Sequence, residues 1–259
     1  MDYEGFKDEV FVLTGINLSY YKEKQMKRRI ESLISKNGYS SYEEYAIALK
    51  RSGTLFNEFI NYLTINVSEF YRNPEQWEVL EKEIFPMLLN DRGSLKIWSA
   101  ACSTGDEPYT LVMVLNKFLP LDKIRIIASD VDKEALEKAK TGIYGYRSLK
   151  KLPACFLDKY FKKIGENYKV IDSVKNCVSF MRHNLLDDEY PRACDLIVCR
   201  NVLIYFTEES KSKIYVKFGK SLKTGGILFV GSTEQIIHPS KYDLNPVKTF
   251  FYIKERETK

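Results

Sequence analysis

The sequence has few of the residues that usually bind metals or form disulfides. It contains only two histidines, His183 and His238, and its five cysteines include no Cys-x-x-Cys pair. Zinc sites and disulfide frameworks are recognised by such residues at close, regular spacing. The sequence therefore indicates neither kind of site, and reduced thiols in a cytosol fit this cysteine usage best.

A long apolar run and an export signal are also missing. No apolar run approaches the roughly 18 residues that a membrane-spanning helix needs. Residues 1–10 carry four acids rather than a basic segment followed by an apolar one. We therefore expect a soluble protein that is not exported.

The excess of positive charge is small. The chain has 40 basic and 35 acidic residues, a formal net charge of +5 at pH 7. A dedicated nucleic-acid binder with a whole basic face usually carries more. At 259 residues and 44% hydrophobic composition, the chain is long enough for one or two globular domains, and it shows no internal repeat.

Apolar residues recur at helical spacing from residue 1 to about residue 72. Met26, Ile30 and Ile34 form one such series, and Phe59 and Leu63 belong to another. Residues at this spacing fall on one face of a helix. We therefore predict a small all-helical domain over residues 1–72.

Another helix start follows at Asn73-Pro74, with Asn73 as the cap and Pro74 in the first turn. We expect residues 73–94 to form a helix that links the two halves of the chain. The residues expected on its inward face are Trp77, Leu80, Ile84 and Leu88.

From residue 95 the pattern changes to short apolar runs separated by helical stretches. The runs are residues 95–100, 124–129, 178–182, 195–199 and 227–231. Such alternation is typical of a parallel sheet with helices on both faces. We therefore predict an α/β domain over residues 95–259.

Two parts of this second domain depart from the alternation. Residues 143–176 contain a predicted hairpin around Gly165, and we interpret them as a small β insertion. The closing run, residues 249–254, has no helix before it and is predicted to be an antiparallel edge strand.

Small and polar residues follow the predicted strands. Residues 101–107 lead from one strand into a helix, and Asp130 ends the next strand. Because ligands of an open parallel sheet bind at the carboxyl ends of its strands, we expect these segments and those around residues 184 and 201 to converge on one crevice. An acid in the place of Asp130 can accept both hydroxyls of an adenosyl ribose.

Several of these signals also have plainer explanations. The loop at 101–107 has one glycine where the dinucleotide fingerprint has three, which disfavours nicotinamide binding. We interpret Asp132 as a helix cap and His183 as a packed or solvated side chain. The polar segment 64–73 is either a turn between domains or a wall over a bound ligand.

Five segments together resemble one family over nearly the whole chain. They are TINVSEFYRN, KIWSAACSTGDEPYTL, IIASDVDKEALEKAKTGIY, the pair Asn184-Leu185, and CDLIVCRNVLIYF. This set is similar to the CheR family of chemoreceptor glutamate methyltransferases. The resemblance implies an N-terminal helical domain and a Rossmann-like S-adenosylmethionine-dependent methyltransferase domain, with a mainly parallel seven-stranded sheet and a small inserted β-subdomain.

The resemblance also implies a reaction and its site. The methyl group of S-adenosylmethionine would pass to receptor glutamates, giving methyl esters and S-adenosylhomocysteine without a metal. Arg72 and Tyr205 would lie closest to the methyl transfer. Ser68 stands where some members have threonine, and Asp106 where many have glutamate, so Asp106 is not counted as a site residue. The implied cofactor contacts are Asn66, Ser68, Arg72, Glu107, Asp130, Asn184, Leu185, Asn201 and Val202.

Two basic clusters are candidates for binding the receptor. In residues 22–36, Lys24, Lys27 and Arg28 share one side of the expected helix. Such a run is either a solvated helix face or a docking face for acidic methylation helices of chemoreceptors. The second cluster lies in and before the predicted hairpin, which the resemblance makes a candidate receptor-binding element. It consists of Arg147, Lys150, Lys151, Lys159, Lys162 and Lys163.

The implied partners are cytoplasmic receptor helices, with no nucleic acid and no membrane insertion. We expect a monomer in the cytoplasm that is recruited to membrane-bound receptor arrays. Two alternatives remain at this point. A nucleic-acid methyltransferase would suit the basic clusters, although residues 201–205 lack the paired prolines of enzymes that methylate exocyclic amines. A regulatory module that only binds the cofactor would be expected to have a degraded crevice.

Overall fold

The computed structural model of the chain describes residues 1–90 and 93–255. These residues form two compact units. One contains residues 1–66 and 203–213, and the other contains residues 67–202 together with the chain from residue 214 onward. The domain boundaries drawn from the sequence at residues 72 and 94 stay predictions.

The first unit is all-helical, as predicted. Its helices are α1 (Tyr3–Thr14), α2 (Glu23–Lys36), α3 (Tyr42–Arg51) and α4 (Gly53–Thr64), with a short 3-10 turn η1 (Leu18–Tyr20). Phe6, Tyr45 and Phe59 are fully buried, and their rings pack against one another at its centre. Side chains of Asp2 and Ser41 cap α1 and α3 by accepting backbone N–H bonds.

A later part of the chain completes this unit. The 3-10 turn η4 (Leu203–Tyr205) and the beginning of α12 (Glu208–Ser221) belong to it. The Lys22 amide donates to the Tyr205 carbonyl over 2.9 Å. Tyr21 and Phe206 form an isolated β-bridge, with ring centroids 4.8 Å apart. The sequence did not indicate that this segment would join the helices.

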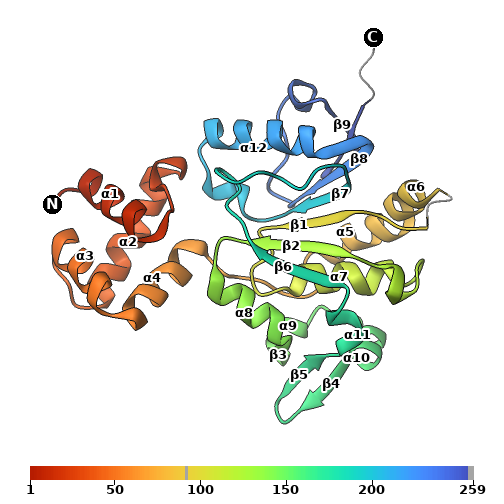
Figure 1. Cartoon of the computed structure of the whole chain (residues 1–259), viewed down its shortest axis with the longest axis horizontal. Helices are drawn as coiled ribbons and strands as arrows, with labels where there is room; N and C mark the ends of the chain where they lie inside the picture. Colours follow the sequence, from red (N-terminus) through yellow and green to blue (C-terminus); the bar gives the residue numbers. More distant parts are fainter. Residues whose placement is uncertain (91–92, 256–259) are drawn as a thin grey trace. The chain divides into compact units, whose positions relative to one another are not determined.

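The second unit is built on a seven-stranded sheet in the order β6-β2-β1-β7-β8-β10-β9 (Figure 1). The pairs among β6, β2, β1, β7 and β8 are all parallel, whereas β10 runs antiparallel to both of its neighbours. The predicted fold class is therefore confirmed. The strands are β1 (Ile97–Ala100), β2 (Ile126–Asp130), β6 (Val178–Arg182), β7 (Cys194–Cys199), β8 (Leu222–Val230), β9 (Leu244–Lys248) and β10 (Phe251–Lys254).

The prediction that the closing run is an edge strand is wrong. That run forms β10, which is antiparallel as expected but lies between β8 and β9. The edge is β9, which carries Pro246. Proline has no backbone N–H to donate to the sheet's hydrogen bonds and is found mainly on edge strands, which suits the position of β9. Because a proline also argues against a strand in the sequence pattern, β9 was not predicted.

Helices cover both faces of this sheet. On one face lie α7 (Asp106–Leu115) and α8 (Lys133–Thr141), seen below the sheet in Figure 1. On the other face, Phe218 of α12 packs against Trp98 of β1, with centroids 5.7 Å apart. The stripe predicted within residues 73–94 is buried in this unit's core, on α5 (Pro74–Val79), the π-helical turn η2 (Leu80–Ile84) and α6 (Phe85–Leu89). Short 3-10 turns η3 (Leu121–Lys123) and η5 (Pro239–Tyr242) complete the connections.

The predicted insertion forms a separate small sheet. Its strands are β3 (Ile143–Gly145), β4 (Phe161–Ile164) and β5 (Asn167–Val170), antiparallel in the order β3-β5-β4 (Figure 1). Short helices α9 (Tyr146–Leu149), α10 (Ala154–Tyr160) and α11 (Asp172–Lys175) flank it. Among residues 1–90 and 93–255, none of the helices has the length and apolar character needed to cross a membrane.

Candidate active site

The parallel strands bring four predicted site segments to one edge of the sheet. In the paired registers, Ala100 lies opposite Ser129, and Asp130 lies opposite Arg182. Cys199 ends β7 beside β1. The loops that follow these strands therefore start from a common edge, where ligands of such sheets bind.

The loop after β1 turns sharply through left-handed backbone conformations, which residues other than glycine rarely adopt. Ala101, Ser103 and Gly105 have φ values of 58°, 48° and 89°. A Cβ on Gly105 would lie 2.8 Å from the Cβ of Ala139 on α8. Glycine is required here because both the positive φ and the close approach exclude a side chain. The Cys102 amide of this loop donates to the Ser129 carbonyl over 2.9 Å, which holds the loop close to the end of β2.

Asp130 is the acid at the end of β2. Its Oδ2 accepts the Ser103 amide over 2.7 Å, and its Oδ1 accepts the Asp132 amide over 2.9 Å. Burial raises the pKa of this carboxyl to about 6, although the backbone amides favour the charged form. Each carboxylate oxygen has a further lone pair, so the group can accept additional hydroxyls. Asp132 caps α8 as expected, because its side chain accepts the amides of Glu134 and Ala135.

The raised pKa of Asp130 predicts pH-dependent cofactor affinity. Burial makes ionisation of this carboxyl unfavourable, so it takes up a proton as the pH falls through about 6. A protonated carboxyl accepts fewer hydroxyls, and affinity for S-adenosylhomocysteine should therefore fall at low pH. We expect roughly a tenfold loss at pH 5, one unit below this pKa, measured by isothermal titration calorimetry. Asp130→Asn should lack this decline; an equally steep decline in that variant would assign it to another group.

Glu107 lies in the first turn of α7. Its Oε1 accepts the Ser99 hydroxyl of β1 over 2.8 Å, and its Oε2 lies 3.5 Å from Nη1 of Arg200. Burial raises the pKa of Glu107, and the arginine and the hydroxyl act in the opposite direction. Contacts from β1 and from the residue after β7 thus fix the position of this carboxylate of α7.

Ser68 and Arg72 lie in the segment before α5. The Arg72 Nη1 donates to the Val67 carbonyl over 3.2 Å. The Ser68 side chain hydrogen-bonds to Asp106, which is 1% exposed and also accepts the Thr104 hydroxyl over 2.6 Å. Asp106 was not counted as a site residue, but it holds the side chain of Ser68, which was predicted to contact the cofactor.

Asn184 and Leu185 form a closed turn after β6. The Asn184 amide donates to Asp188 over 2.8 Å, and its side-chain Nδ2 donates to Asp187 over 2.6 Å. The Leu185 carbonyl accepts the Tyr190 hydroxyl over 2.6 Å. His183 was interpreted from the sequence as packed or solvated. It is packed, with its ring against that of Trp98.

Asn201 and Val202 follow β7. Asn201 has a φ of 62°, and its amide donates to Glu234 Oε2 over 2.6 Å. Glu234 is 5% exposed and also accepts the Gly231 amide over 2.9 Å. Sequence reasoning missed Glu234, because no motif surrounds it and only the fold brings it back to Asn201.

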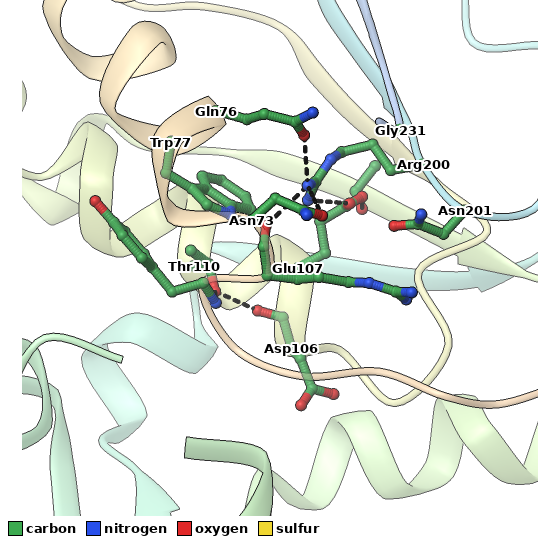
Figure 2. Close-up of polar contacts among 12 residues, drawn as sticks. Asn73, Gln76, Trp77, Asp106, Glu107, Thr110, Arg200, Asn201 and Gly231 are labelled. Carbon is green, nitrogen blue, oxygen red and sulfur yellow. Dashed lines mark hydrogen bonds and ion pairs between the residues drawn. The ribbon is translucent and has the colours of Figure 1, made fainter. Parts of the chain in front are cut away.

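Arg200 is the second residue that sequence reasoning missed. It is 6% exposed, and its Nη2 bonds to Gln76 Oε1 over 2.8 Å, to the Arg72 carbonyl over 2.8 Å and to Asn73 Oδ1 over 3.3 Å. Figure 2 shows Asn73, Gln76 and Glu107 around the guanidinium of Arg200. The sequence signal was a cation directly after a strand of apolar residues, inside the motif CDLIVCRN.

These contacts overturn the prediction that the Asn73 side chain caps α5. Asn73 occupies the cap position with a φ of 59°, but its side chain accepts no amide of that helix. The oxygen instead accepts from the guanidinium of Arg200. A charge-assisted bond to a buried cation outweighs a local cap.

The remaining predicted residues lie in the first unit. Asn66 donates to Thr64 Oγ1 over 3.0 Å at the end of α4, and Tyr205 lies in η4. Lys24, Lys27 and Arg28 lie on α2. In the part of the chain that the structure describes, no group of three or more histidine, cysteine or acidic side chains could hold a metal ion.

Similarity to known proteins covers both units. Residues 1–64 match the family model described as CheR methyltransferase, all-alpha domain, and residues 66–251 match CheR methyltransferase, SAM binding domain. A "Chemotaxis protein methyltransferase" of Listeria monocytogenes is 45% identical over 93% of this chain and 92% of its own. Proteins with the same name are 34% identical in Borreliella burgdorferi, over 86% of this chain and 83% of theirs, and in Escherichia coli, over 88% and 82%. The chain therefore belongs to the CheR methyltransferase family, and its cofactor is S-adenosylmethionine.

Proposed function

We propose that this protein methylates the γ-carboxylates of glutamates on bacterial chemoreceptors, producing glutamate methyl esters and S-adenosylhomocysteine. The observation that carries the proposal is family membership over both units, with a 45% identical relative that is named a chemotaxis protein methyltransferase. On this proposal the protein acts as a monomer in the cytoplasm, at membrane-bound receptor arrays.

The residues at the sheet edge suit an adenosyl cofactor. Asp130 is a buried carboxylate with backbone amides as its partners and lone pairs left for ribose hydroxyls. The tight loop after β1 brings the Ser103 amide to that carboxylate. We propose that Ser68, Arg72, Glu107, Asn184, Leu185, Asn201 and Val202 make the other cofactor contacts of this unit, and Asn66 one from the helical unit.

The proposed reaction does not require a strong general base. A glutamate carboxylate is ionised near neutral pH, since its unperturbed pKa is about 4.3. When bound, S-adenosylmethionine supplies a methyl group activated by its sulfonium sulfur. The chain therefore needs to align the acceptor oxygen and to exclude water, and alignment alone can contribute roughly 7 to 11 kcal/mol.

We assign the alignment to Arg72 and Tyr205, an assignment that rests on the family resemblance. Arg72 is a half-buried cation, four residues after Ser68 in the same segment. Its guanidinium can attract the acceptor carboxylate and present two N–H groups in a fixed plane. The Tyr205 hydroxyl would orient the reacting groups.

Transfer of labelled methyl groups to receptor membranes tests the proposal. Purified protein and methyl-labelled S-adenosylmethionine are incubated with chemoreceptor membranes or, separately, with RNA. Methyl esters release methanol in mild base, whereas methylated amines do not. We expect base-labile label on the receptor band. Label on RNA, or base-stable label on the receptor, would contradict the proposal.

The predicted docking face on α2 presents exposed positive charge. Lys24 and Arg28 are exposed, whereas Lys27 lies over the Tyr3 ring, 5.3 Å from its centroid. Other cations of this helix are engaged, since Arg29 stacks on Tyr62 and donates to its carbonyl over 2.7 Å. We propose that Lys24, Lys27 and Arg28 dock on acidic methylation helices of the receptor.

Reversing charge on this face should weaken receptor methylation. The variant Lys27→Glu/Arg28→Glu should raise KM for receptor roughly tenfold at low ionic strength, with a smaller effect in high salt because salt screens exposed charges. Initial rates against receptor concentration at two salt concentrations measure this. The control Lys220→Glu makes the same kind of charge change at an exposed position of α12. An unchanged KM in the α2 variant would remove the docking proposal.

A further inference from the structure

Arg200 is a buried cation, and the partners of one of its nitrogens all come from one short segment. Three acceptors surround its Nη2, namely the Arg72 carbonyl, Asn73 Oδ1 and Gln76 Oε1. Its guanidinium packs against two aromatic rings, 5.3 Å from the centroid of Trp77 and 4.7 Å from that of Phe229, which themselves contact each other with centroids 6.1 Å apart. The planar group is therefore fixed both by its hydrogen bonds and by packing against these rings.

The other end of the guanidinium faces Glu107, which is one of the proposed cofactor contacts. Its Nη1 lies 3.5 Å from Oε2 of Glu107, whose second oxygen is held by Ser99. One guanidinium thus joins a carboxylate of α7 to the main chain of Arg72. The cofactor contact proposed for Glu107 and the alignment proposed for Arg72 share this support.

The segment around Arg72, which Arg200 holds, has a backbone conformation that is unfavourable without contacts from its surroundings. Tyr71 and Asn73, on either side of Arg72, have φ values of 55° and 59°. Left-handed conformations are unfavourable for residues other than glycine and persist where surrounding contacts enforce them. The Arg72 carbonyl accepts both Arg200 and the Trp77 indole Nε1, the latter over 2.9 Å. The Tyr71 amide is held by Thr110 of α7 over 3.3 Å.

We propose that Arg200 is a positioning residue for methyl transfer, which sets the main chain of Arg72 and the carboxylate of Glu107 in a fixed relation. It acts through these two residues and does not itself touch the acceptor. The proposal rests on the proposed function for its effect on turnover, but its effect on cofactor binding needs only the cofactor.

Two substitutions at Arg200 separate charge from geometry. Arg200→Met keeps much of the packing and removes every donor, and we expect kcat on receptor to fall roughly 30-fold through misplacement of Arg72. Arg200→Lys keeps the charge but cannot span acceptors on both sides, so its kcat should lie between that of Arg200→Met and wild type. Both variants should also bind S-adenosylhomocysteine more weakly, as measured by calorimetry without receptor.

A double-mutant cycle distinguishes positioning from general loss of structure. If Arg200 acts on turnover through Arg72, then adding Arg200→Met to Arg72→Ala should lower kcat no further. The matched control is Lys223→Met, which breaks the 2.9 Å ion pair of Lys223 with buried Asp195 at the opposite end of β7. This control should lose thermal stability but keep wild-type kcat.

Different outcomes contradict different statements. Wild-type turnover in Arg200→Met, or losses that multiply in the double variant, would overturn the action through Arg72. Unchanged affinity for S-adenosylhomocysteine in Arg200→Met would overturn the action through Glu107. A wild-type protein that binds S-adenosylhomocysteine but does not methylate receptor would overturn the proposed function, while the affinity measurement would still decide the Glu107 part.

Discussion

Replacing Asp130 with alanine is expected to lower the affinity for S-adenosylhomocysteine by roughly 100-fold. Two hydrogen bonds from ribose hydroxyls to a carboxylate contribute about 1.5 kcal/mol each at the low end of their range, and about 3 kcal/mol corresponds to roughly 100-fold in affinity. The substitution also leaves the Ser103 and Asp132 amides without their acceptor. Isothermal titration calorimetry at pH 7.5 measures the change.

The neighbouring acid Asp132 offers a matched control. Its side chain accepts two amides of the first turn of α8, and asparagine is an equally good cap. Asp132→Asn should therefore keep wild-type affinity. If Asp130→Ala binds as tightly as Asp132→Asn, the ribose contact assigned to Asp130 is wrong.

Replacing Arg72 with alanine is expected to lower kcat on receptor by roughly 100- to 1,000-fold, the loss typical when one preorganised charged or polar group is removed from a reacting centre. Arg72→Lys should recover part of the loss, because it keeps a cation without the planar fork. Turnover is measured at saturating cofactor and receptor, so that weaker binding does not enter the result.

The same assay tests Tyr205. Tyr205→Phe should lower kcat roughly tenfold, because it removes a hydroxyl that orients the reacting groups. Tyr20→Phe is the matched control in the same unit, since it also removes only a hydroxyl and keeps the ring that lies under Lys213. Wild-type turnover in both Arg72→Ala and Tyr205→Phe would refute the roles assigned to this pair.

The parallel part of the fold could be predicted because its signal is local. Each of its strands is an apolar run, and the residues at its carboxyl end are small or polar. The strand containing Pro246 gave no such signal, because its ladder is completed by β10 further along the chain. Its existence is decided by pairing rather than by its own composition.

The candidate site was predictable only in part, for a related reason. Asp130 ends β2, and Asn184 and Asn201 follow β6 and β7, so the topology places all three at the carboxyl ends of the parallel strands. Glu234 and Arg200 act through contacts with residues far away in the sequence, such as the bonds from Arg200 to Gln76 and from Asn201 to Glu234. Buried charges of this kind are recognisable only when their partners are known.

Because residues 203–213 belong to the helical unit, that unit is not one continuous piece of the chain. The chain passes between the two units at three points, after Asn66, after Val202 and after Lys213. A fragment ending at Asn66 would therefore lack Phe206 and expose the ring of Tyr21, which Phe206 covers. A protease nick after Asn66 would leave a piece of the helical unit on the larger fragment. A gene designed to express the helical unit alone should therefore encode residues 203–213 in addition to residues 1–66.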